Sequence, residues 1–338
     1  MVLLRKLLFP FAILYGLVTQ LRNMLYDNGI FRSYRFDVPI IAVGNLSVGG
    51  TGKSPQVEYL IRLLSEKYRV AVLSRGYKRK SEGFILADDN ASAELLGDEP
   101  FQIHRKFPNI DVAVDADRKN GVEKLLSKTK KPEVILLDDA YQHRKVKAGF
   151  YILLTAYGDL YADDFLLPTG NLREGRKGAE RAEIVIVTKC PPGISNNQQD
   201  EIRVKLKINN RQQLYFTVIQ YDDFVYSNDH QIDVDEIRRE PKLLLAGIAK
   251  PQPFFAYLQR DSDIIMAFPD HHHFSGNDIQ EILRKAAGKR IITTEKDFVR
   301  LSGIIASDRL FYLPIKSEFI SGAENFDKTI LNFVGTSI

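Results

Sequence analysis

The stretch VGNLSVGGTGKSP, at residues 43–55, carries residue types that can bind phosphate. Its glycines let backbone N–H groups converge on an anion at a helix N-terminus. Lys53 can reach the β- and γ-phosphates of a nucleotide, and the Ser54 hydroxyl can help to hold Mg²⁺. The stretch departs from the usual spelling G-x-x-x-x-G-K-[ST], because Ser47 stands where that pattern has its first glycine.

The flanks decide between a phosphate loop and a glycine-rich turn without a ligand. The preceding run VPIIAVGN is β-branched and apolar, which predicts a buried parallel strand. The following PQVEYLIRLLSEKY has apolar residues at helical spacing, with Pro55 in the first turn. Strand, glycine loop and helix are the context that a phosphate loop requires. We therefore predict a nucleotide-binding loop formed by Ser47, Val48, Gly49, Gly50, Thr51, Gly52, Lys53 and Ser54.

A pair of carboxylates is the second chemical feature. VILLDD places Asp138 and Asp139 directly after four apolar residues, at the end of a predicted strand. One carboxylate can hold the water shell of Mg²⁺ and the other can orient it. An acidic strand end is common by itself, but together with the glycine loop it indicates a Mg²⁺-nucleotide site.

Two further stretches offer groups that could handle a proton. GDEP places Asp98 and Glu99 in a predicted loop, where a carboxylate could accept the proton of a phosphoryl acceptor; a helix-capping aspartate is an equal alternative. FPDHHHF contains the densest histidine cluster, at 271–273. Three adjacent side chains cannot all converge on one metal ion, so a single catalytic or substrate-contacting histidine is favoured.

Composition limits the class of protein. The chain has 338 residues, enough for two domains, and one cysteine, Cys190, which excludes an internal disulfide and fits a reducing compartment. Residues 1–36 hold five basic residues and one acid, whereas the rest of the chain has equal numbers of each. Without a second basic cluster, a nucleic-acid partner is not expected.

The N-terminus is apolar and flanked by basic residues. Fifteen uncharged residues lie between Lys6 and Arg22, fewer than the ~20 that a spanning helix needs. A signal peptide lacks support, because no A-x-A-like cleavage site follows, and a helix buried in the core is the other alternative. We expect a helix that lies peripherally in a membrane interface, with its basic flanks at anionic headgroups of the cytoplasmic leaflet.

The order of predicted strands and helices indicates an α/β fold. Strands ending in polar residues alternate with helical stretches such as GVEKLLSK, which predicts a phosphate-loop NTPase-like parallel sheet with helices on both faces. Its strand ends gather Arg75, Asp115, Asp117, the aspartate pair at 138–139 and Lys189, where ligands of such folds bind. KLLLAGIA, DIIMAFPD, KRIITTEKD and RLFYLPI predict a second, smaller α/β domain. The expected divisions are a membrane-interface helix at 1–27, a phosphate-loop domain at 28–212, a linker ribbon at 213–235 and a small domain at 236–338, which closes over the active site.

In combination these stretches resemble the tetraacyldisaccharide 4′-kinase family, also called lipid A 4′-kinases. The resemblance runs along nearly the whole chain and rests on the basic apolar N-terminus, VGNLSVGGTGKSP, LSRGY, GDEP, DDAYQH, LPTGNLRE, VTKCP, GIAKPQPFF, FPDHHHF and TTEKDFVRL, in that order. DDAYQH has Ala140-Tyr141 where the family often shows Gly-Phe, and Gly175 stands where proline is usual. Neither departure removes a reactive group.

The resemblance implies transfer of the γ-phosphate of ATP, with Mg²⁺, to the 4′-hydroxyl of a tetraacyldisaccharide 1-phosphate lipid at the cytoplasmic face of the inner membrane. It implies Asp98 as general base, partnered by His271, and Asp138 and Asp139 at the metal with Ser54. Glu174 would assist at the metal, and Arg75 and Arg118 would stabilise phosphate charge. These roles are expectations carried over from the family.

Two alternatives remain. A membrane-attached ATPase switch would usually have an extra lysine in its phosphate loop, at the position of Val48, and a GTPase switch would have N-K-x-D where this chain has VTKCPP. A kinase of a soluble small molecule is the closer alternative, but it would not need the apolar basic N-terminus.

Overall fold

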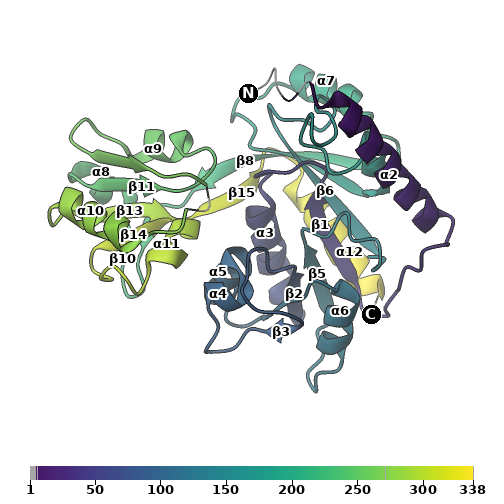
Figure 1. Cartoon of the computed structure of the whole chain (residues 1–338), viewed down its shortest axis with the longest axis horizontal. Helices are drawn as coiled ribbons and strands as arrows, with labels where there is room; N and C mark the ends of the chain where they lie inside the picture. The colour runs from purple at the N-terminus through teal and green to yellow at the C-terminus, as the bar shows by residue number, and fades with distance from the viewer. Residues whose placement is uncertain (1–4, 6, 271, 338) are drawn as a thin grey trace.

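The computed structural model of the chain describes residues 5, 7–270 and 272–337. Figure 1 shows two bodies, each built on its own sheet, joined by the neighbouring strands β8 and β15. We call the large sheet with its helices the first lobe, and the small sheet with its helices the second lobe.

Within the described residues, the large sheet has nine strands in the order β15-β8-β7-β6-β1-β5-β2-β4-β3. In that order they span Ile315–Phe319, Gln213–Tyr221, Ile184–Thr188, Phe150–Ala156, Ile40–Asn45, Val134–Asp138, Val70–Ser74, Asp111–Val114 and Ile85–Leu86. The strands from β8 to β4 are parallel to their neighbours, and the edge strands β15 and β3 are antiparallel. The parallel arrangement brings the carboxyl ends of β1, β5, β6 and β7 to one edge.

Helices cover both faces of this sheet, because successive strand residues point to opposite sides. Ile41 and Val43 of β1 pack with apolar residues of α3 (Lys53–Ser65), α5 (Asp98–Lys106) and α12 (Ala323–Ser337). Ile40 and Ala42 face the other side, which α6 (Arg118–Leu126) covers. Next to it, α7 (Asn196–Leu206) packs over β6 and β7. The short α4 (Ala93–Leu96) and η1 (Arg176–Arg181) lie in connections.

In the described part of the second lobe, six strands run in the order β10-β9-β14-β13-β11-β12. They span Gln231–Asp233, Phe224–Tyr226, Leu310–Leu313, Ile291–Thr294, Leu243–Ala246 and Ile264–Ala267. One face packs against α8 (Val234–Arg239) and α9 (Gln252–Leu258), the other against α10 (Gly276–Ala286) and α11 (Glu295–Leu301). The four strands expected from sequence are β11 to β14, and all four are parallel.

The chain divides between the lobes differently from the expected ranges. β8, expected in a linker, forms the large sheet beside β7, while β9 and β10 of the same range belong to the small sheet. β15 and α12, expected in the small domain, return to the first lobe, where Phe326, Ile330 and Val334 are fully buried. This arrangement depends on strand pairing between segments that are distant in sequence, which local hydrophobic periodicity does not predict.

The N-terminal helix α2 (Phe9–Asp27) lies along the outside of the first lobe (Figure 1). Polar side chains hold it there: the Tyr15 hydroxyl donates to the Arg173 carbonyl at 2.8 Å, and Asn23 donates to Glu174 at 3.0 Å. Its outward side is apolar, with Phe11, Leu14, Leu17, Val18 and Leu21 each more than half exposed. No described helix combines the length and the apolar character needed to cross a bilayer.

Candidate active site

The glycine loop lies between β1 and α3, as expected. Gly52 precedes the first residue of α3 with φ +79°, and Gly49 has φ +118°, conformations that side-chain-bearing residues rarely adopt. Gln56 N–H already reaches back to the Gly52 carbonyl, at 3.3 Å. Among the described residues, no hydrogen-bond acceptor is found for the N–H groups of Gly50, Gly52, Lys53 and Ser54. These amides at the start of a helix are free to bind an anion.

The aspartate pair follows β5, the neighbour of β1. Val43 of β1 pairs with Asp138, so the end of β5 lies beside the start of the loop. Asp139 has φ +46°, a left-handed conformation that short polar residues tolerate. Lys53 Nζ lies 3.7 Å from Asp139 Oδ1. The sequence prediction that these two motifs meet is therefore confirmed by the geometry.

Arg173 completes this contact and was not expected from sequence. Its guanidinium donates to both oxygens of Asp139, at 2.8 and 3.1 Å, and to the Asn45 carbonyl at 3.1 Å. Burial would raise the pKa of Asp139, but Lys53 and the hydrogen bonds of Arg173 outweigh it and lower that pKa to about 2. Asp139 is therefore a permanent anion. Arg173 belongs to the motif LPTGNLRE, in which the neighbouring Glu174 is singled out from the sequence instead.

The pKa of Asp138 is shifted in the opposite direction. Asp138 is buried at the strand end, where it accepts a hydrogen bond from the Ser74 hydroxyl at 3.3 Å. Burial, with the negative charges of Glu99 and Asp139 nearby, raises the pKa of Asp138 to about 7. Adjacent carboxylates with pKa values pushed in opposite directions are typical of a functional site.

The donors at this edge suit Mg²⁺ bound together with a nucleotide. Mg²⁺ prefers oxygen ligands and is held by one or two carboxylates plus substrate phosphates. Ser54, Asp138 and Asp139 supply such oxygens. No group of three or more acidic, histidine or cysteine side chains that could hold a metal ion occurs among the described residues.

Residues at the end of β7 donate hydrogen bonds to the glycine loop. Lys189 Nζ donates to the Gly50 carbonyl at 2.6 Å, and the Thr188 hydroxyl donates to the Thr51 carbonyl at 2.8 Å. These bonds turn two loop carbonyls toward β7. The Thr51 hydroxyl is buried without a hydrogen-bond partner among the described residues.

Glu174 is not brought to the aspartate pair. Its buried carboxylate receives hydrogen bonds from Arg181 at 2.8 and 2.9 Å, Gln142 at 2.9 Å and Asn23 at 3.0 Å. No hydrogen bond or ion pair joins it to Ser54, Asp138 or Asp139 in the described structure. Glu174 links α2 to η1 here, and Arg173 is the residue of this motif that reaches Asp139.

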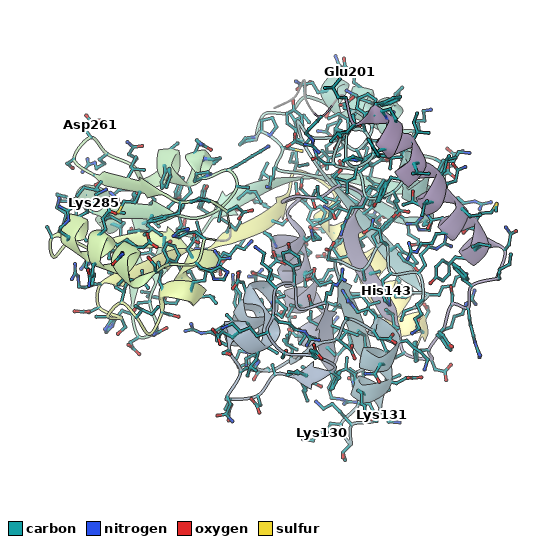
Figure 2. All side chains as sticks on the ribbon, viewed as in Figure 1. Lys130, Lys131, His143, Glu201, Asp261 and Lys285 are labelled. Atoms are coloured by element: carbon teal, nitrogen blue, oxygen red, sulfur yellow. The ribbon has the colours of Figure 1, made fainter. Side chains whose placement is uncertain are left out.

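The two arginines expected to stabilise phosphate charge differ in their surroundings. Arg118 is buried and donates to the carbonyls of Asp115, at 3.0 Å, and Asp138, at 3.4 Å. Burial lowers the pKa of Arg118 to about 10, so it stays cationic. Arg75, which follows β2, is exposed. His143, labelled in Figure 2, ends DDAYQH, and burial together with Arg118 lowers its pKa to about 4.

Asp98 and Glu99 do not lie in a loop. They open α5, with Gly97 as its N-cap residue, so the capping alternative for Asp98 is also wrong. Asp98 Oδ2 accepts hydrogen bonds from Nε of Arg300, at 3.0 Å, and from its Nη2. Glu99 lies 3.8 Å from Lys296 Nζ. Both cations belong to α11 of the second lobe, so the start of α5 lies where the two lobes meet.

His271, the expected partner of Asp98, lies outside the described residues. Its neighbour His272 stacks on Phe268 at 4.8 Å between ring centroids and contacts Asp278 at 3.1 Å. Asp270, just before the cluster, lies 4.0 Å from Lys296. Asp270 therefore lies beside the helix that contacts Asp98.

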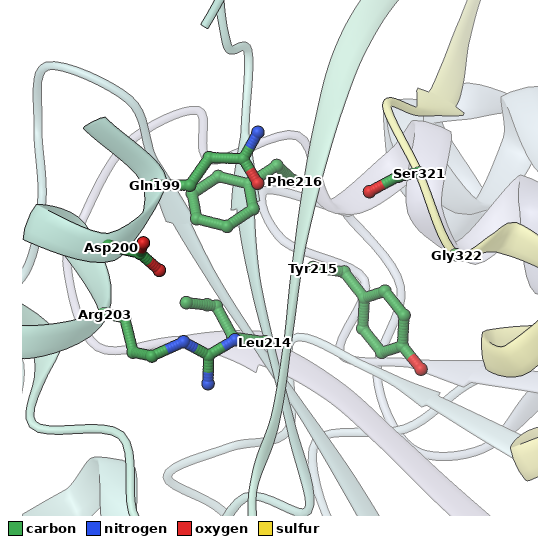
Figure 3. A pocket seen from close by; sticks show the side chains of 8 residues that line it. All are labelled: Gln199, Asp200, Arg203, Leu214, Tyr215, Phe216, Ser321 and Gly322. Carbon is green, nitrogen blue, oxygen red and sulfur yellow. The ribbon is translucent and has the colours of Figure 1, made fainter. Parts of the chain in front are cut away.

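A pocket of about 260 Å³ lies elsewhere, on the first lobe between α7, β8 and the start of α12. Asp200 and Arg203 of α7 lie on the same side of β8 as Phe216, while Tyr215 points to the other side (Figure 3). None of its lining residues belongs to the glycine loop or the aspartate pair. The residues of the glycine loop and the aspartate pair therefore lie at the strand ends, away from this pocket.

Comparisons with known proteins point to one family. Residues 4–335 match the family profile described as tetraacyldisaccharide-1-P 4′-kinase. A tetraacyldisaccharide 4′-kinase of Flavobacterium johnsoniae is 65% identical over 332 residues, 98% of each chain. One of Bacteroides thetaiotaomicron is 45% identical over 356 residues, covering 98% of this chain and 93% of that relative.

A solved structure shares the fold. The crystal structure described as the "apo" form of LpxK from Aquifex aeolicus in complex with ATP has a TM-score of 0.80 and is 31% identical. The similarity covers 98% of this chain and 99% of that one, so it includes both lobes.

Proposed function

We propose an active site and a mechanism for this chain, which belongs to the tetraacyldisaccharide-1-P 4′-kinase family. It is accordingly a kinase that transfers the γ-phosphate of ATP to the 4′-hydroxyl of a tetraacyldisaccharide 1-phosphate lipid, in lipid A biosynthesis. One observation carries the assignment of the site: the glycine loop and the Lys53–Asp139–Arg173 contact occupy the same strand edge.

In this mechanism the loop binds the triphosphate. The N–H groups of Gly50, Gly52, Lys53 and Ser54 surround the phosphates, and Lys189 and Thr188 keep the loop carbonyls turned away from them. Lys53 is held by Asp139 before nucleotide arrives, and its ammonium neutralises charge on the γ-phosphate during transfer. Ser54, Asp138 and Asp139 would hold Mg²⁺, which would supply further charge neutralisation when bound. Pre-positioned cations of this kind are effective because they need no rearrangement during the reaction.

Asp98 is proposed as the group that accepts the proton of the 4′-hydroxyl, with His271 as its partner. The field of Glu99, the next residue, reaches Asp138, which supports proximity between the start of α5 and the metal-binding edge. The transition state of phosphoryl transfer is loose, so orienting the acceptor oxygen is a large part of this role. Closure of the second lobe over both substrates would exclude water and limit ATP hydrolysis.

The outward face of α2 supports peripheral attachment to the cytoplasmic leaflet of the inner membrane. Its inner side is polar and bonded to the protein, so the exposed apolar side chains are the ones left to enter a lipid interface. The expected headgroup contacts need revision, because Arg5 donates to the Pro168 carbonyl and Arg22 to the Gln142 carbonyl. Attachment is therefore proposed to depend mainly on apolar burial.

The test is incubation of the full chain with ATP labelled at the γ-phosphate and a tetraacyldisaccharide 1-phosphate dispersed in detergent. Label is expected on the lipid, and Lys53→Met is expected to lower kcat at least ~100-fold. Exposed Lys78, at positive φ outside this cluster, provides the control as Lys78→Met. Label released only as free phosphate would indicate an ATPase switch instead. Equal rates for Lys53→Met and the native chain would contradict the proposed site.

A further inference from the structure

Arg300 connects the second lobe to Asp98, and neither the sequence motifs nor the mechanism above gives it a role. It lies in α11, 202 positions after Asp98. Its side chain is only 9% exposed, and two of its nitrogens donate to the same oxygen of Asp98, Oδ2. A buried guanidinium with two donors on one carboxylate fixes the position of that carboxylate, because its planar fork allows little rotation.

The other side of the guanidinium is anchored inside the second lobe. Arg300 Nη1 donates to Oδ1 of Asp297, a fully buried carboxylate, at 3.4 Å. Asp297 in turn accepts from the N–H of Gly247, at 2.8 Å, and from the Thr294 hydroxyl, at 2.7 Å. Gly247 follows β11, and a Cβ there would lie 2.9 Å from Asp297 Oδ1. The place of Arg300 is therefore set by the strand ends of the small sheet.

We propose that Arg300 is the positioning residue of Asp98: its guanidinium holds the Asp98 carboxylate in place for the acceptor hydroxyl, and it does so only while the two lobes are in contact. The inference rests on the proposed role of Asp98 as proton acceptor. Nε and Nη2 of Arg300 both donate to Oδ2 of Asp98, so one guanidinium of the second lobe restrains this carboxylate of the first lobe. Separation of the lobes would remove the arginine and release the carboxylate, which couples transfer to lobe contact.

The experiment compares Arg300→Gln and Arg300→Lys with Asp98→Asn and with the Arg300→Gln/Asp98→Asn double variant, all as full chains. The control is Arg105→Gln. Arg105 crosses the same contact between α5 and the second lobe, to Ser302 at 3.2 Å and Asn228 at 2.7 Å, but does not contact Asp98. The measurements are kcat and KM for both substrates, and the thermal midpoint.

Arg300→Gln is expected to lower kcat by ~30–300-fold, with KM for ATP within about twofold, because misplacing a reacting group costs roughly that factor. Arg300→Lys keeps the charge but not the fork, so it is expected to have an intermediate kcat and a native thermal midpoint. The double variant should be no slower than Asp98→Asn alone, since the arginine acts through the carboxylate. Arg105→Gln should keep kcat within about twofold.

Several outcomes would overturn the proposal. One is a native kcat for Arg300→Gln or Arg300→Lys. Another is that the rate losses of the single variants multiply in the double variant. A third is an equal loss of kcat in Arg105→Gln, which would mean that contact between the lobes in general, and not Arg300, determines the rate. A native kcat for Asp98→Asn would remove the proposed proton acceptor itself, together with the inference that rests on it. Failure of the native chain to label lipid would instead refute the proposed function.

Discussion

At the strand ends, two neighbouring carboxylates lie in very different electrostatic environments. Asp138 is buried beside other acids, whereas Asp139 is held by Lys53 and Arg173. In the nucleotide-free protein the first therefore opposes folding when it is ionised, and the second supports it. Asp138 therefore lowers the stability of the folded protein, whereas the ion pairs of Asp139 raise it.

Replacement of Asp138 by Asn is expected to raise the thermal midpoint of the nucleotide-free protein at pH 8 while abolishing transfer. The folded pKa of about 7 exceeds the unfolded value of 3.8, so Asp138 makes stability fall as pH rises through that window. The difference from the native chain should be several degrees at pH 8 and should shrink as pH approaches about 4. Calorimetry or a fluorescence melt at several pH values measures it.

Asp139→Asn is the matched comparison. Its folded pKa of about 2 lies below the unfolded value of 3.8, so its ionised form stabilises the protein above that range and the effect is lost as pH falls. The variant is expected to lower the midpoint at pH 8. Shifts of the same sign in both variants would contradict the charge assignment.

At the scale of single elements, α2 has two sides with different roles: one side bonds to the protein and the other is exposed. Its polar side bonds to Glu174 and to the carbonyl of Arg173, the residue that binds Asp139, while its apolar side is exposed. Removal of the whole helix would therefore disturb the active site as well as any membrane contact. A test of attachment needs surface substitutions instead.

The triple variant Leu14→Gln, Leu17→Gln, Leu21→Gln is expected to lose at least tenfold in vesicle binding, because it removes three exposed apolar side chains from the face proposed to enter the interface. Its kcat for lipid dispersed in detergent should stay native, since the polar side of α2 is intact. Vesicle sedimentation and the detergent assay measure the two quantities.

The control for this variant is exposed Val204 of α7, replaced by Gln, which should change neither. Native vesicle binding by the triple variant would exclude α2 as the attachment surface.

At the scale of the whole molecule, the lobes meet through ion pairs of very different burial. Lys106 of α5 contacts Glu58 of α3 at 2.7 Å and Glu295 of α11 at 2.6 Å, with both carboxylates almost fully buried. Burial and Glu58 raise the pKa of Glu295 to about 7. Lys250 and Asp159 also join the lobes, at 2.6 Å, but both are exposed.

Lys106→Met is expected to lower the free energy of unfolding by about 3–5 kcal/mol at pH 8, since it leaves two buried carboxylates facing each other. The loss should be smaller at pH 6, where Glu295, with its raised pKa, is neutral. Lys250→Met, at the exposed pair, should cost about 1 kcal/mol or less. Urea unfolding at both pH values checks this. Equal costs for the two variants would mean that the cluster does not stabilise lobe contact.

The sequence predicted relative positions correctly where the motifs are local. The loop from Ser47 to Ser54 and the pair at 138–139 are short motifs between predictable elements, and adjacent parallel strands bring them together. It could not find the contact of Arg300 with Asp98, because hydrophobic periodicity shows that a helix exists but not which distant helix its charged side faces. The role of Arg173 is hidden from sequence for a similar reason: either Arg173 or Glu174 could reach a strand end, and only the packed structure separates them.

The return of β15 and α12 to the large sheet has a consequence for the order in which the protein is made. The ribosome must synthesise the entire second lobe, residues 224–313, before the strand and helix that complete the first lobe emerge. Until then the apolar face of the large sheet that Phe326, Ile330 and Val334 cover is open to water. The nascent nucleotide-binding sheet is therefore exposed to aggregation or chaperones for as long as the smaller lobe takes to be translated.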